Sequence, residues 1–336
     1  MKARTALLGA AGVAVTGAAG LGLALAREYR RLDPAADDDF SALADLVHHT
    51  IATDDGAQLH VVERGHAEGR PLLFVHGVTL STDVWRYQLR DLADEFRVLA
   101  LDQRGHGRSV PGTDGWAVDR LGRDIATVLE TLDLRGAIVV GHSMGGFATM
   151  KFCIDHPDVL ADRVAGVTLI NTSAGQFFGP GRERMLPVVR RAIVAGAKQS
   201  ANANRHAAYM GTRVTLGRRP SRSHVRLTYD LNRATDPATM TGCVLAFLDM
   251  DLRDALKTVH VPAVVVAGSQ DRLTPPRYAR TIADRLAGAK LVILPGCGHM
   301  SMLERHDELD QLIADFSASL PAPARPSSLR SVPATG

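Results

Sequence analysis

The most constraining feature of this 336-residue sequence is a regular alternation of short apolar runs with amphipathic segments, which begins at about residue 48. The apolar runs are rich in Val, Ile and Leu, as expected for parallel strands that are covered on both faces. Helices between successive strands predict an α/β fold, with a mostly parallel sheet flanked by helices. The expected strands are residues 71–75, 98–101, 137–140, 164–170, 261–267 and 291–294, and the expected helices are residues 85–93, 118–132, 144–154, 277–286 and 303–317.

The alternation is interrupted at two places. Residues 47–53 and 58–63 flank an Asp-Asp-Gly turn, which predicts a hairpin that brings the sheet to eight strands. Residues 175–257 contain no core strand, and such a stretch is too long for a connecting loop. Because its pattern is helical, we interpret it as a helical cap inserted over the strand ends, where ligands bind in open α/β sheets.

Ser143 is the strongest candidate for a catalytic nucleophile. It is the central residue of Gly-His-Ser-Met-Gly at 141–145, which follows an expected strand and opens an expected helix. A sharp turn between a strand and a helix holds such a serine in a strained conformation and exposes its oxygen above the sheet. Small residues are needed at both ends of the motif because neighbouring backbone approaches closely.

A serine nucleophile needs a base, and the base needs an orienting carboxylate. His299 follows the last expected strand within Gly-Cys-Gly-His, and Asp271 follows the preceding strand within Gly-Ser-Gln-Asp. The order Ser143, Asp271, His299 predicts a catalytic triad on the ends of parallel strands. Asp249 and Asp251 are weaker alternatives to Asp271.

Two backbone N–H groups are expected to bind the oxyanion that forms when a serine attacks a carbonyl. One belongs to Met144, at the start of the helix, and the other to Val78, which follows the strand at 71–75. Candidates for the wall of a substrate pocket are His76, Gly77, Trp85 and His142, for which packing roles are an open alternative.

These motifs together resemble the α/β-hydrolase superfamily, in particular its branch of esterases, lipases and cofactor-free haloperoxidases. The resemblance covers about residues 48–318 and is carried by Val-His-Gly at 75–77, Asp-Gln-Arg-Gly-His-Gly at 102–107, residues 141–146 and Gly298-His299. It implies a single α/β-hydrolase domain that needs no metal or organic cofactor. Ser143 stands where epoxide hydrolases and haloalkane dehalogenases of this fold carry Asp, which argues against both activities.

The leading hypothesis is a serine hydrolase that cleaves small carboxylic esters through an acyl-enzyme intermediate. The same residues are compatible with a C–C bond hydrolase, a lactonase or a haloperoxidase-like perhydrolase. A non-catalytic binding protein is a further alternative, although loss of a triad residue would be its signature and all three residue types are present.

The N-terminal segment predicts a contact with the membrane. Residues 5–26 carry no charge over 22 positions, which is long enough to cross a bilayer, and basic residues flank them on both sides. We expect residues 1–31 to be a membrane anchor, with a signal peptide cleaved at the Ala-Leu-Ala of 24–26 and secretion as the alternative. Residues 32–47 are expected to be a linker and residues 319–336 a disordered tail. The side of the membrane and the oligomeric state stay open.

Charge and cysteine content narrow the choice of partners. The stretch from Arg182 to Arg233 contains twelve Arg or Lys and two acidic residues, although the net charge of the whole chain is only +3. Such a patch is interpreted first as a solvated, Arg-rich helical face, with contact to anionic lipid and a lipid-derived substrate as the alternative. The stretch has few aromatic residues and matches no nucleic-acid recognition motif, which argues against nucleic-acid binding. The three cysteines match no metal-binding or disulfide spacing.

Overall fold

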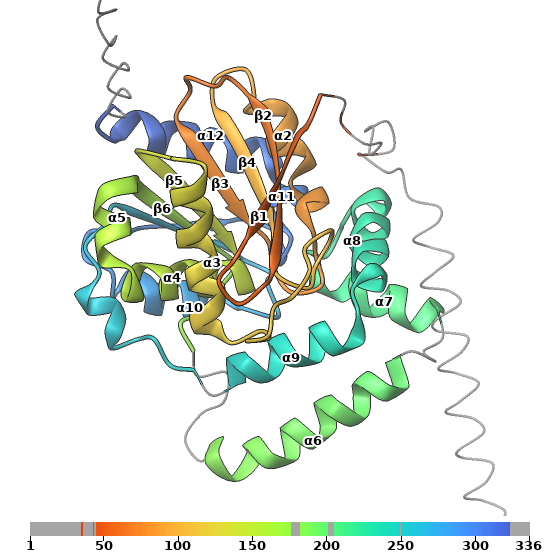
Figure 1. The fold of residues 1–336 in the computed structure, drawn as a ribbon. Coiled ribbons are helices and arrows are strands. Elements are labelled where there is room, and N and C mark those ends of the chain that lie inside the picture. The colour runs from red at the N-terminus through yellow and green to blue at the C-terminus, as the bar shows by residue number, and fades with distance from the viewer. Residues whose placement is uncertain are drawn as a thin grey trace, which may run out of the picture.

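The computed structural model describes residues 45–175, 182–200, 205–248 and 250–322, together with residues 35 and 43. Its centre is an eight-stranded sheet in the order β1-β2-β4-β3-β5-β6-β7-β8. The strands lie between layers of helices (Figure 1). The strands are β1 (Val47–Ala52), β2 (Gln58–Gly65), β3 (Pro71–Val75), β4 (Arg97–Asp102), β5 (Ala137–His142), β6 (Val164–Ile170), β7 (Ala263–Gly268) and β8 (Lys290–Leu294).

The predicted α/β fold with a mostly parallel eight-stranded sheet is confirmed. The expected hairpin is present: β1 pairs antiparallel with β2, and β2 pairs antiparallel with β4. All the other pairs, from β4 and β3 across to β7 and β8, are parallel. The carboxyl ends of these parallel strands therefore meet at one edge of the sheet, where the predicted site residues follow them.

Each face of the sheet is covered because side chains alternate along a strand. On β3, Leu73 and Val75 pack into a core with α3, α4, α5 and α10, whereas Leu72 and Phe74 pack into a second core with α2, α11 and α12. Burial on both faces explains why the strands are apolar without interruption. The helices are α2 (Arg86–Asp91), α3 (Val118–Thr131), α4 (Met144–Asp155), α5 (Pro157–Arg163), α10 (Pro276–Ala283), α11 (Ser301–Glu304) and α12 (His306–Ser319), with 3-10 turns at η1 (Thr82–Trp85) and η2 (Ala255–Thr258).

Two of the predicted helices are each divided into two elements in the structure. The helix expected at 85–93 is a 3-10 turn followed by the shorter α2. The helix expected at 303–317 is divided into α11 and α12, because Arg305 has the non-helical angles φ −143° and ψ 44°. α5 was not expected, although Pro157 stands in its first turn, a position that proline favours.

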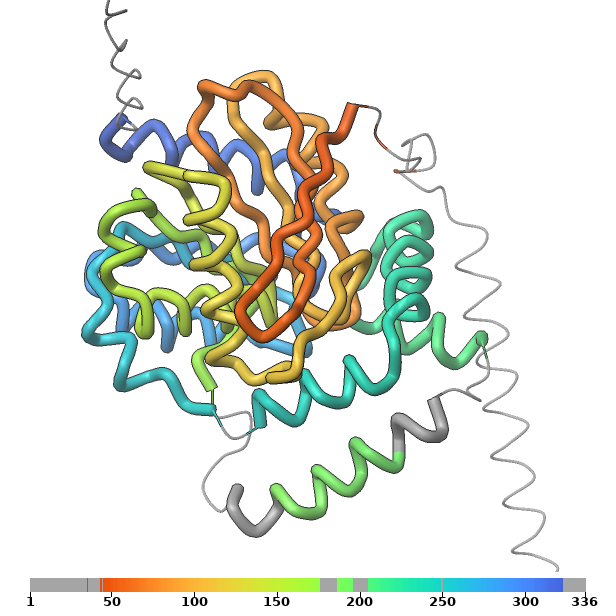
Figure 2. The backbone as a smooth tube through the Cα atoms, viewed as in Figure 1, coloured from red at the N-terminus to blue at the C-terminus, as the bar shows by residue number. Residues whose placement is uncertain are grey.

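Four helices occupy the interval between β6 and β7 in which the inserted cap is expected. α6 packs on α9, and α7 packs on α8. In the views of Figures 1 and 2, α6 and α9 run side by side below the sheet. We refer to these four helices as the inserted helices: α6 (Arg182–Ser200), α7 (Arg205–Thr215), α8 (Arg222–Ala234) and α9 (Pro237–Leu248).

The expectation of a membrane-anchored protein is corrected at this point. Among the residues that the structure describes, no helix has the length and apolar character needed to cross a bilayer. The segment 5–26, on which both the anchor and the signal-peptide interpretations depend, lies outside the described residues. Most of the expected linker and most of the expected C-terminal tail lie outside them as well.

The loop after β4 is held by a buried ion-pair network. The side chain of Arg104 is 0% exposed and donates to Asp55 and Asp124, whose side chains are 2% and 3% exposed. Arg104 also holds the pKa of Asp55 well below its ordinary value. The network joins this loop to the β1–β2 turn and to α3, which gives residues 102–107 a structural role.

We expect Arg104→Met to lower the free energy of unfolding by about 3–5 kcal/mol, because it leaves two buried carboxylates without their cation. The measurement is urea unfolding of the variant and the wild type. Arg123→Met is the matched control, since Arg123 is 55% exposed and pairs with Asp54 at the surface, where a loss of at most about 1 kcal/mol is expected. Equal losses in the two variants would contradict a stabilising role for the network.

Candidate active site

Ser143 lies between the end of β5 and the start of α4, in a strained backbone conformation. Its φ is 52° and its ψ is −113°, a combination that non-glycine residues rarely adopt. The Ser143 N–H donates to the Ile170 carbonyl at 3.0 Å, and Thr172 Oγ1 donates to the Ser143 carbonyl at 2.7 Å. Both contacts come from β6 and the residues after it, so the neighbouring strand holds the turn in this conformation.

Close approach of the backbone explains the small residues around Ser143. A Cβ atom at Gly145 would overlap the Val75 carbonyl at the end of β3. A Cβ atom at Gly77 would lie 2.9 Å from His142 Nδ1 and 3.1 Å from Ser143 Cβ. The turns that follow β3 and β5 are therefore in direct contact, and larger side chains would separate them.

The structure brings Asp271 and His299 together. Asp271 Oδ2 lies 2.8 Å from His299 Nδ1, and the two residues are 4% and 5% exposed. Asp271 also accepts bonds from the Thr274 N–H at 2.9 Å, the Thr274 hydroxyl at 2.7 Å and the Asn171 side-chain amide at 2.9 Å. These bonds fix the carboxylate, which in turn orients the imidazole so that Nε2 faces away from it.

The charge on Asp271 is stabilised although the residue is buried. Burial opposes ionisation, but His299 and Thr274 outweigh it and lower the pKa of Asp271 to about 2. The carboxylate is therefore ionised at neutral pH. His142 differs, because burial and the nearby His299 hold its pKa well below the ordinary value and keep its ring neutral.

No direct hydrogen bond joins Ser143 to His299 in the described part of the chain, but the residue before Ser143 contacts His299. His142, which precedes Ser143, places its ring centroid 4.8 Å from that of His299 and its Nε2 2.9 Å from the His299 carbonyl. Hydrogen bonds between a nucleophile and its base often tighten only when substrate binds, so this arrangement is compatible with a serine–histidine pair.

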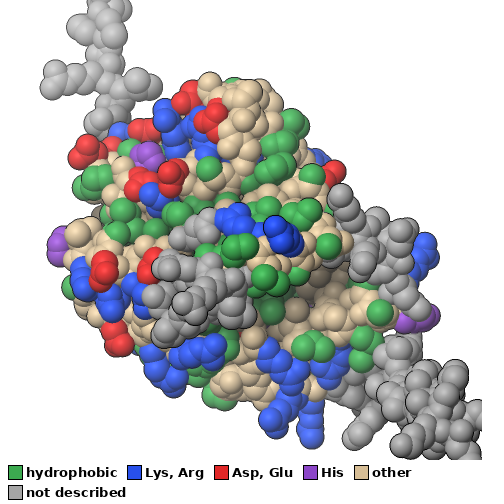
Figure 3. All heavy atoms as spheres, turned by 90° about the horizontal axis from the view of Figure 1, so that it is seen from below, with side chains coloured by type: hydrophobic (Ala, Val, Ile, Leu, Met, Phe, Trp, Pro, Cys, Tyr) green, Lys and Arg blue, Asp and Glu red, His purple; other side chains and the backbone are tan. Residues whose placement is uncertain are grey.

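Ser143 opens into a largely apolar cavity of about 400 Å³. Val78 and Met144 lie on its wall beside Ser143, and Met144 is the first residue of α4, where a helix leaves N–H groups without intrahelical partners. Figure 3 views the hollowed face below the sheet, with hydrophobic side chains along the hollow and Lys and Arg side chains around it. The other lining residues are Phe147, Thr172, Ser173, Val189, Ile193, Val244, Phe247, Leu248, Leu273 and Thr274.

Four residues were predicted to line a substrate pocket: His76, Gly77, Trp85 and His142. None of them is among the described residues that line this cavity. Trp85 is fully buried between Phe74 and His142. His76 accepts a bond from the Gln103 N–H and has its Nδ1 2.7 Å from the Gly77 carbonyl. These residues pack the base of the site.

The alternatives to Asp271 are not part of this arrangement among the described residues. Asp251 pairs with Arg253 at 2.7 Å, and Asp249 lies outside the described residues. Cys297 is buried, and burial raises the pKa of its thiol, which disfavours the nucleophilic thiolate.

Sequence patterns missed two residues that hold this site. Asn171 has a positive φ of 46° and donates to Asp271 and to the Gly298 carbonyl at 2.7 Å, so it links the two loops that carry Asp271 and His299. Its only sequence signal is a polar residue directly after a buried strand.

Glu304 is the second residue that the sequence did not reveal. Its carboxylate accepts the N–H groups of Gly298 at 3.1 Å and Met300 at 3.2 Å, on either side of His299. It also accepts the Gly217 N–H at 2.7 Å, from the loop between α7 and α8. Glu304 therefore ties the His299 loop to the inserted helices. A single acidic residue after the apolar Met302-Leu303 was the available signal.

Comparison with known proteins identifies the family. The family model described as alpha/beta hydrolase fold matches residues 70–306, and the chain belongs to that family. The chain is 27% identical over 276 residues to the AB hydrolase superfamily protein YisY of Bacillus subtilis, a match that covers 81% of this chain and 99% of the relative.

Two further similarities cover most of the chain. It is 30% identical over 283 residues to a non-heme haloperoxidase of Rhodococcus erythropolis, which covers 80% of this chain and 99% of the relative. Among solved structures, a hydrolase from Pseudomonas aeruginosa has a TM-score of 0.69 and 28% identity, with 82% of this chain and 99% of that chain covered. The protein therefore belongs to a family of hydrolytic enzymes.

We expect Glu304→Ala to lower the free energy of unfolding by about 2–4 kcal/mol, because three backbone N–H groups lose their acceptor. Glu304→Gln keeps one amide oxygen as an acceptor and is expected to lose less. The measurement is denaturant unfolding, with Glu308→Ala as the control because Glu308 is exposed on α12 and pairs only with the adjacent Arg305 among the described residues. A Glu304→Ala variant as stable as this control would rule out the bridging role.

Proposed function

We propose that the protein is a serine hydrolase that cleaves carboxylic esters through an acyl-enzyme intermediate, with Ser143, His299 and Asp271 as its catalytic triad. The observation that carries this proposal is the strained Ser143 at the wall of an apolar cavity, next to a buried Asp271–His299 pair. A strained serine is retained only where the surrounding structure enforces it, and such positions concentrate at active sites.

The reaction follows from the positions of these groups. Ser143 Oγ attacks the ester carbonyl carbon while His299 Nε2 takes the hydroxyl proton, and a tetrahedral oxyanion forms. When this intermediate collapses, the ester C–O bond breaks and His299 returns the proton to the departing alcohol. Water then attacks the acyl group with His299 as its base, which releases the carboxylic acid and restores Ser143. Asp271 holds the imidazole at Nδ1 throughout.

Charge that develops on the carbonyl oxygen is stabilised by backbone groups in this proposal. The N–H groups of Val78 and Met144 act as the oxyanion donors, since both residues border the cavity beside Ser143. The positive end of the dipole of α4 lies at the same point and adds to the effect. One such donor contributes about 3 kcal/mol of transition-state stabilisation.

The cavity favours an apolar acyl group over a charged one. Its wall is predominantly aliphatic and aromatic, and α6 and α9 contribute Val189, Ile193, Val244, Phe247 and Leu248. In this proposal the inserted helices act as a cap at residues 175–257. The cap is part of a single hydrolase domain that spans residues 48–318. A volume of about 400 Å³ suits small esters with acyl chains of about four to eight carbons.

A perhydrolase is the second candidate, favoured by the similarity to a protein named as a non-heme haloperoxidase. In that reaction hydrogen peroxide takes the place of water and attacks the acyl-enzyme, which releases a peracid. Lactones and C–C bonds are further substrates for the same machinery, and assays on these substrates separate the alternatives.

We expect the full-length protein to hydrolyse p-nitrophenyl esters, and Ser143→Ala to lower kcat by at least about 10³-fold. A fluorophosphonate is expected to label the wild type at Ser143, as located by peptide mass spectrometry. Ser319→Ala is the control, because Ser319 lies at the end of α12, far along the chain from the site, and is exposed.

Undiminished hydrolysis by Ser143→Ala would show that the nucleophile is wrongly assigned. If the wild type cleaves no ester but is still labelled at Ser143, the nucleophile stands and the substrate class is wrong. Lactones, vinylogous diketones and peroxide-dependent reactions would then be assayed in its place.

We expect Val244→Phe to shift the preferred ester toward shorter acyl chains, because the larger ring fills part of the cavity wall. The value of kcat/KM for the longest accepted ester is expected to fall by about tenfold, with little change for the acetate. Leu245→Phe is the matched control on the same helix, since Leu245 is not among the residues that line the cavity. An unchanged chain-length profile in Val244→Phe would place the acyl group elsewhere.

A further inference from the structure

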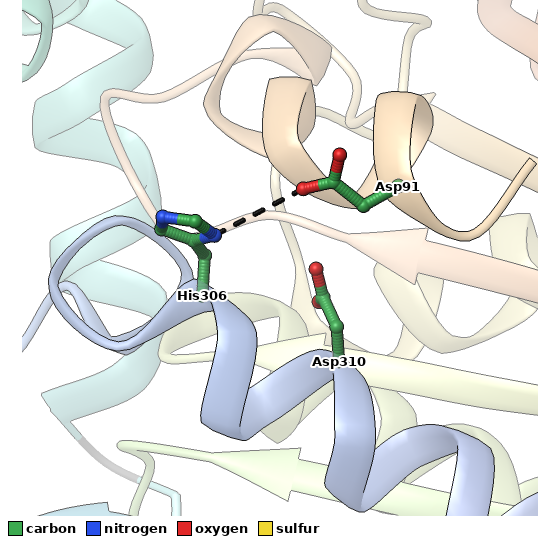
Figure 4. Close-up of side chains that lie close together, drawn as sticks. All are labelled: Asp91, His306 and Asp310. Atoms are coloured by element: carbon green, nitrogen blue, oxygen red, sulfur yellow. Dashed lines mark ion pairs between the residues drawn. The ribbon is translucent and has the colours of Figure 1, made fainter. Parts of the chain in front are cut away.

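A cluster of metal-ligating side chains lies where α2 ends and α12 begins. Asp91 is the last residue of α2, whereas His306 and Asp310 stand four residues apart on α12 and so share one face of that helix. One ligand atom from each of the three lies within 4.8 Å of the other two. Figure 4 shows the three side chains pointing toward one another, with an ion pair between His306 and Asp91.

Asp310 is aimed into this cluster with one oxygen unsatisfied. The residue is 6% exposed, and Gln88 Nε2 donates to its Oδ1 at 2.9 Å. Its Oδ2 is buried and has no hydrogen-bond partner within the described part of the chain. Because an unsatisfied buried carboxylate oxygen is costly, this atom indicates a missing partner.

The charge around the cluster favours a cation as that partner. Asp307 brings a third carboxylate, whose Oδ1 lies 3.1 Å from His306 Nδ1. Three carboxylates, those of Asp91, Asp307 and Asp310, therefore lie around a single imidazole. Arg90 donates to both oxygens of Asp91, but it supplies a single charge and its side chain is 45% exposed.

The imidazole of His306 is held in place by an aromatic neighbour. The His306 ring stacks on Tyr87 with ring centroids 3.8 Å apart and planes at 5°. Tyr87 is itself fixed, because its hydroxyl lies 2.9 Å from His224 Nε2 on α8. Neighbours that donate hydrogen bonds typically orient the ligands of a metal site, as Gln88 does for Asp310.

We propose that Asp91, His306 and Asp310 form a binding site for a divalent transition-metal ion, with Zn²⁺ as the favoured ion. Imidazole and carboxylate together suit Zn²⁺ or Mn²⁺, and a given site of this kind binds Zn²⁺ more tightly than Mn²⁺. Ligand bonds of about 2.0–2.2 Å require the three atoms to close slightly on the ion, and Asp91, at the end of its helix, is placed to make that movement.

The ion has a structural role in this proposal. The ion joins α2 to α12, and α12 follows the His299 loop and α11 in the chain. It also replaces the repulsion between the carboxylates by three bonds to the metal. None of the three ligands borders the cavity at Ser143, so the inference is independent of the proposed hydrolysis.

The test is isothermal titration of the chelator-treated full-length protein with ZnCl₂, followed by MnCl₂ in a separate titration. We expect one Zn²⁺ per chain, and at least tenfold weaker binding in Asp310→Asn and in His306→Gln. Asp310→Asn preserves the side-chain shape and removes a buried charge, so it is expected to fold, as melting without metal will verify. Asp158→Asn and His260→Gln alter exposed residues elsewhere and are expected to bind like the wild type.

Electron paramagnetic resonance of Mn²⁺ gives a second readout that does not respond to Zn²⁺ capture by cysteines. The proposal is overturned if the wild type binds neither ion at one per chain. It is also overturned if Asp310→Asn and His306→Gln bind as tightly as the two control variants.

Discussion

The contact between the turns that follow β3 and β5 is the constraint on which the rest of the site depends. Gly145 packs so closely on the Val75 carbonyl, and Gly77 on His142 and Ser143, that the two turns form one unit. This contact, together with the hydrogen bonds with Ile170 and Thr172, holds Ser143 at a positive φ, and it sets Val78 and Met144 beside Ser143 on the cavity wall. The proposed nucleophile and the two proposed backbone donors therefore follow two strands that pair directly, β3 and β5.

The inserted helices are joined to the sheet through the loop that carries His299. The His299 N–H donates to the Thr215 carbonyl at 2.8 Å, and Glu304 binds the N–H groups of Gly217 and Gly298. A side chain at Gly298 would overlap Gly217, so the two loops are in close contact. The segment that shapes the cavity and the segment that holds the imidazole are thus parts of one hydrogen-bonded assembly.

Much of the fold could be predicted because the relevant signals are local. β3 and β6 have the bounds that their apolar runs predicted. The strand, turn and helix around Ser143 made it recognisable as a candidate nucleophile. The break at Arg305 was not predictable in this way. It follows an apolar helical pattern, and the division arises where Glu304 turns back to bind the His299 loop.

The membrane prediction was wrong for a related reason. It rested on the apolar length of residues 5–26 and on the basic residues on both sides of them, and no helix in the described ranges could cross a bilayer. Both signals are properties of neighbouring residues in the sequence.

The sequence by itself determined the fold class and the chain order of Ser143, Asp271 and His299, because strand periodicity and the turn motif are written in neighbouring residues. Only the tertiary structure decided which side chains meet. Asn171 and Glu304 come from other elements than the residues they hold, and the cavity wall combines α6 and α9 with the strand ends. The same is true of Asp91 beside His306 and Asp310. Such contacts join positions far apart in the chain, and local patterns carry no record of them.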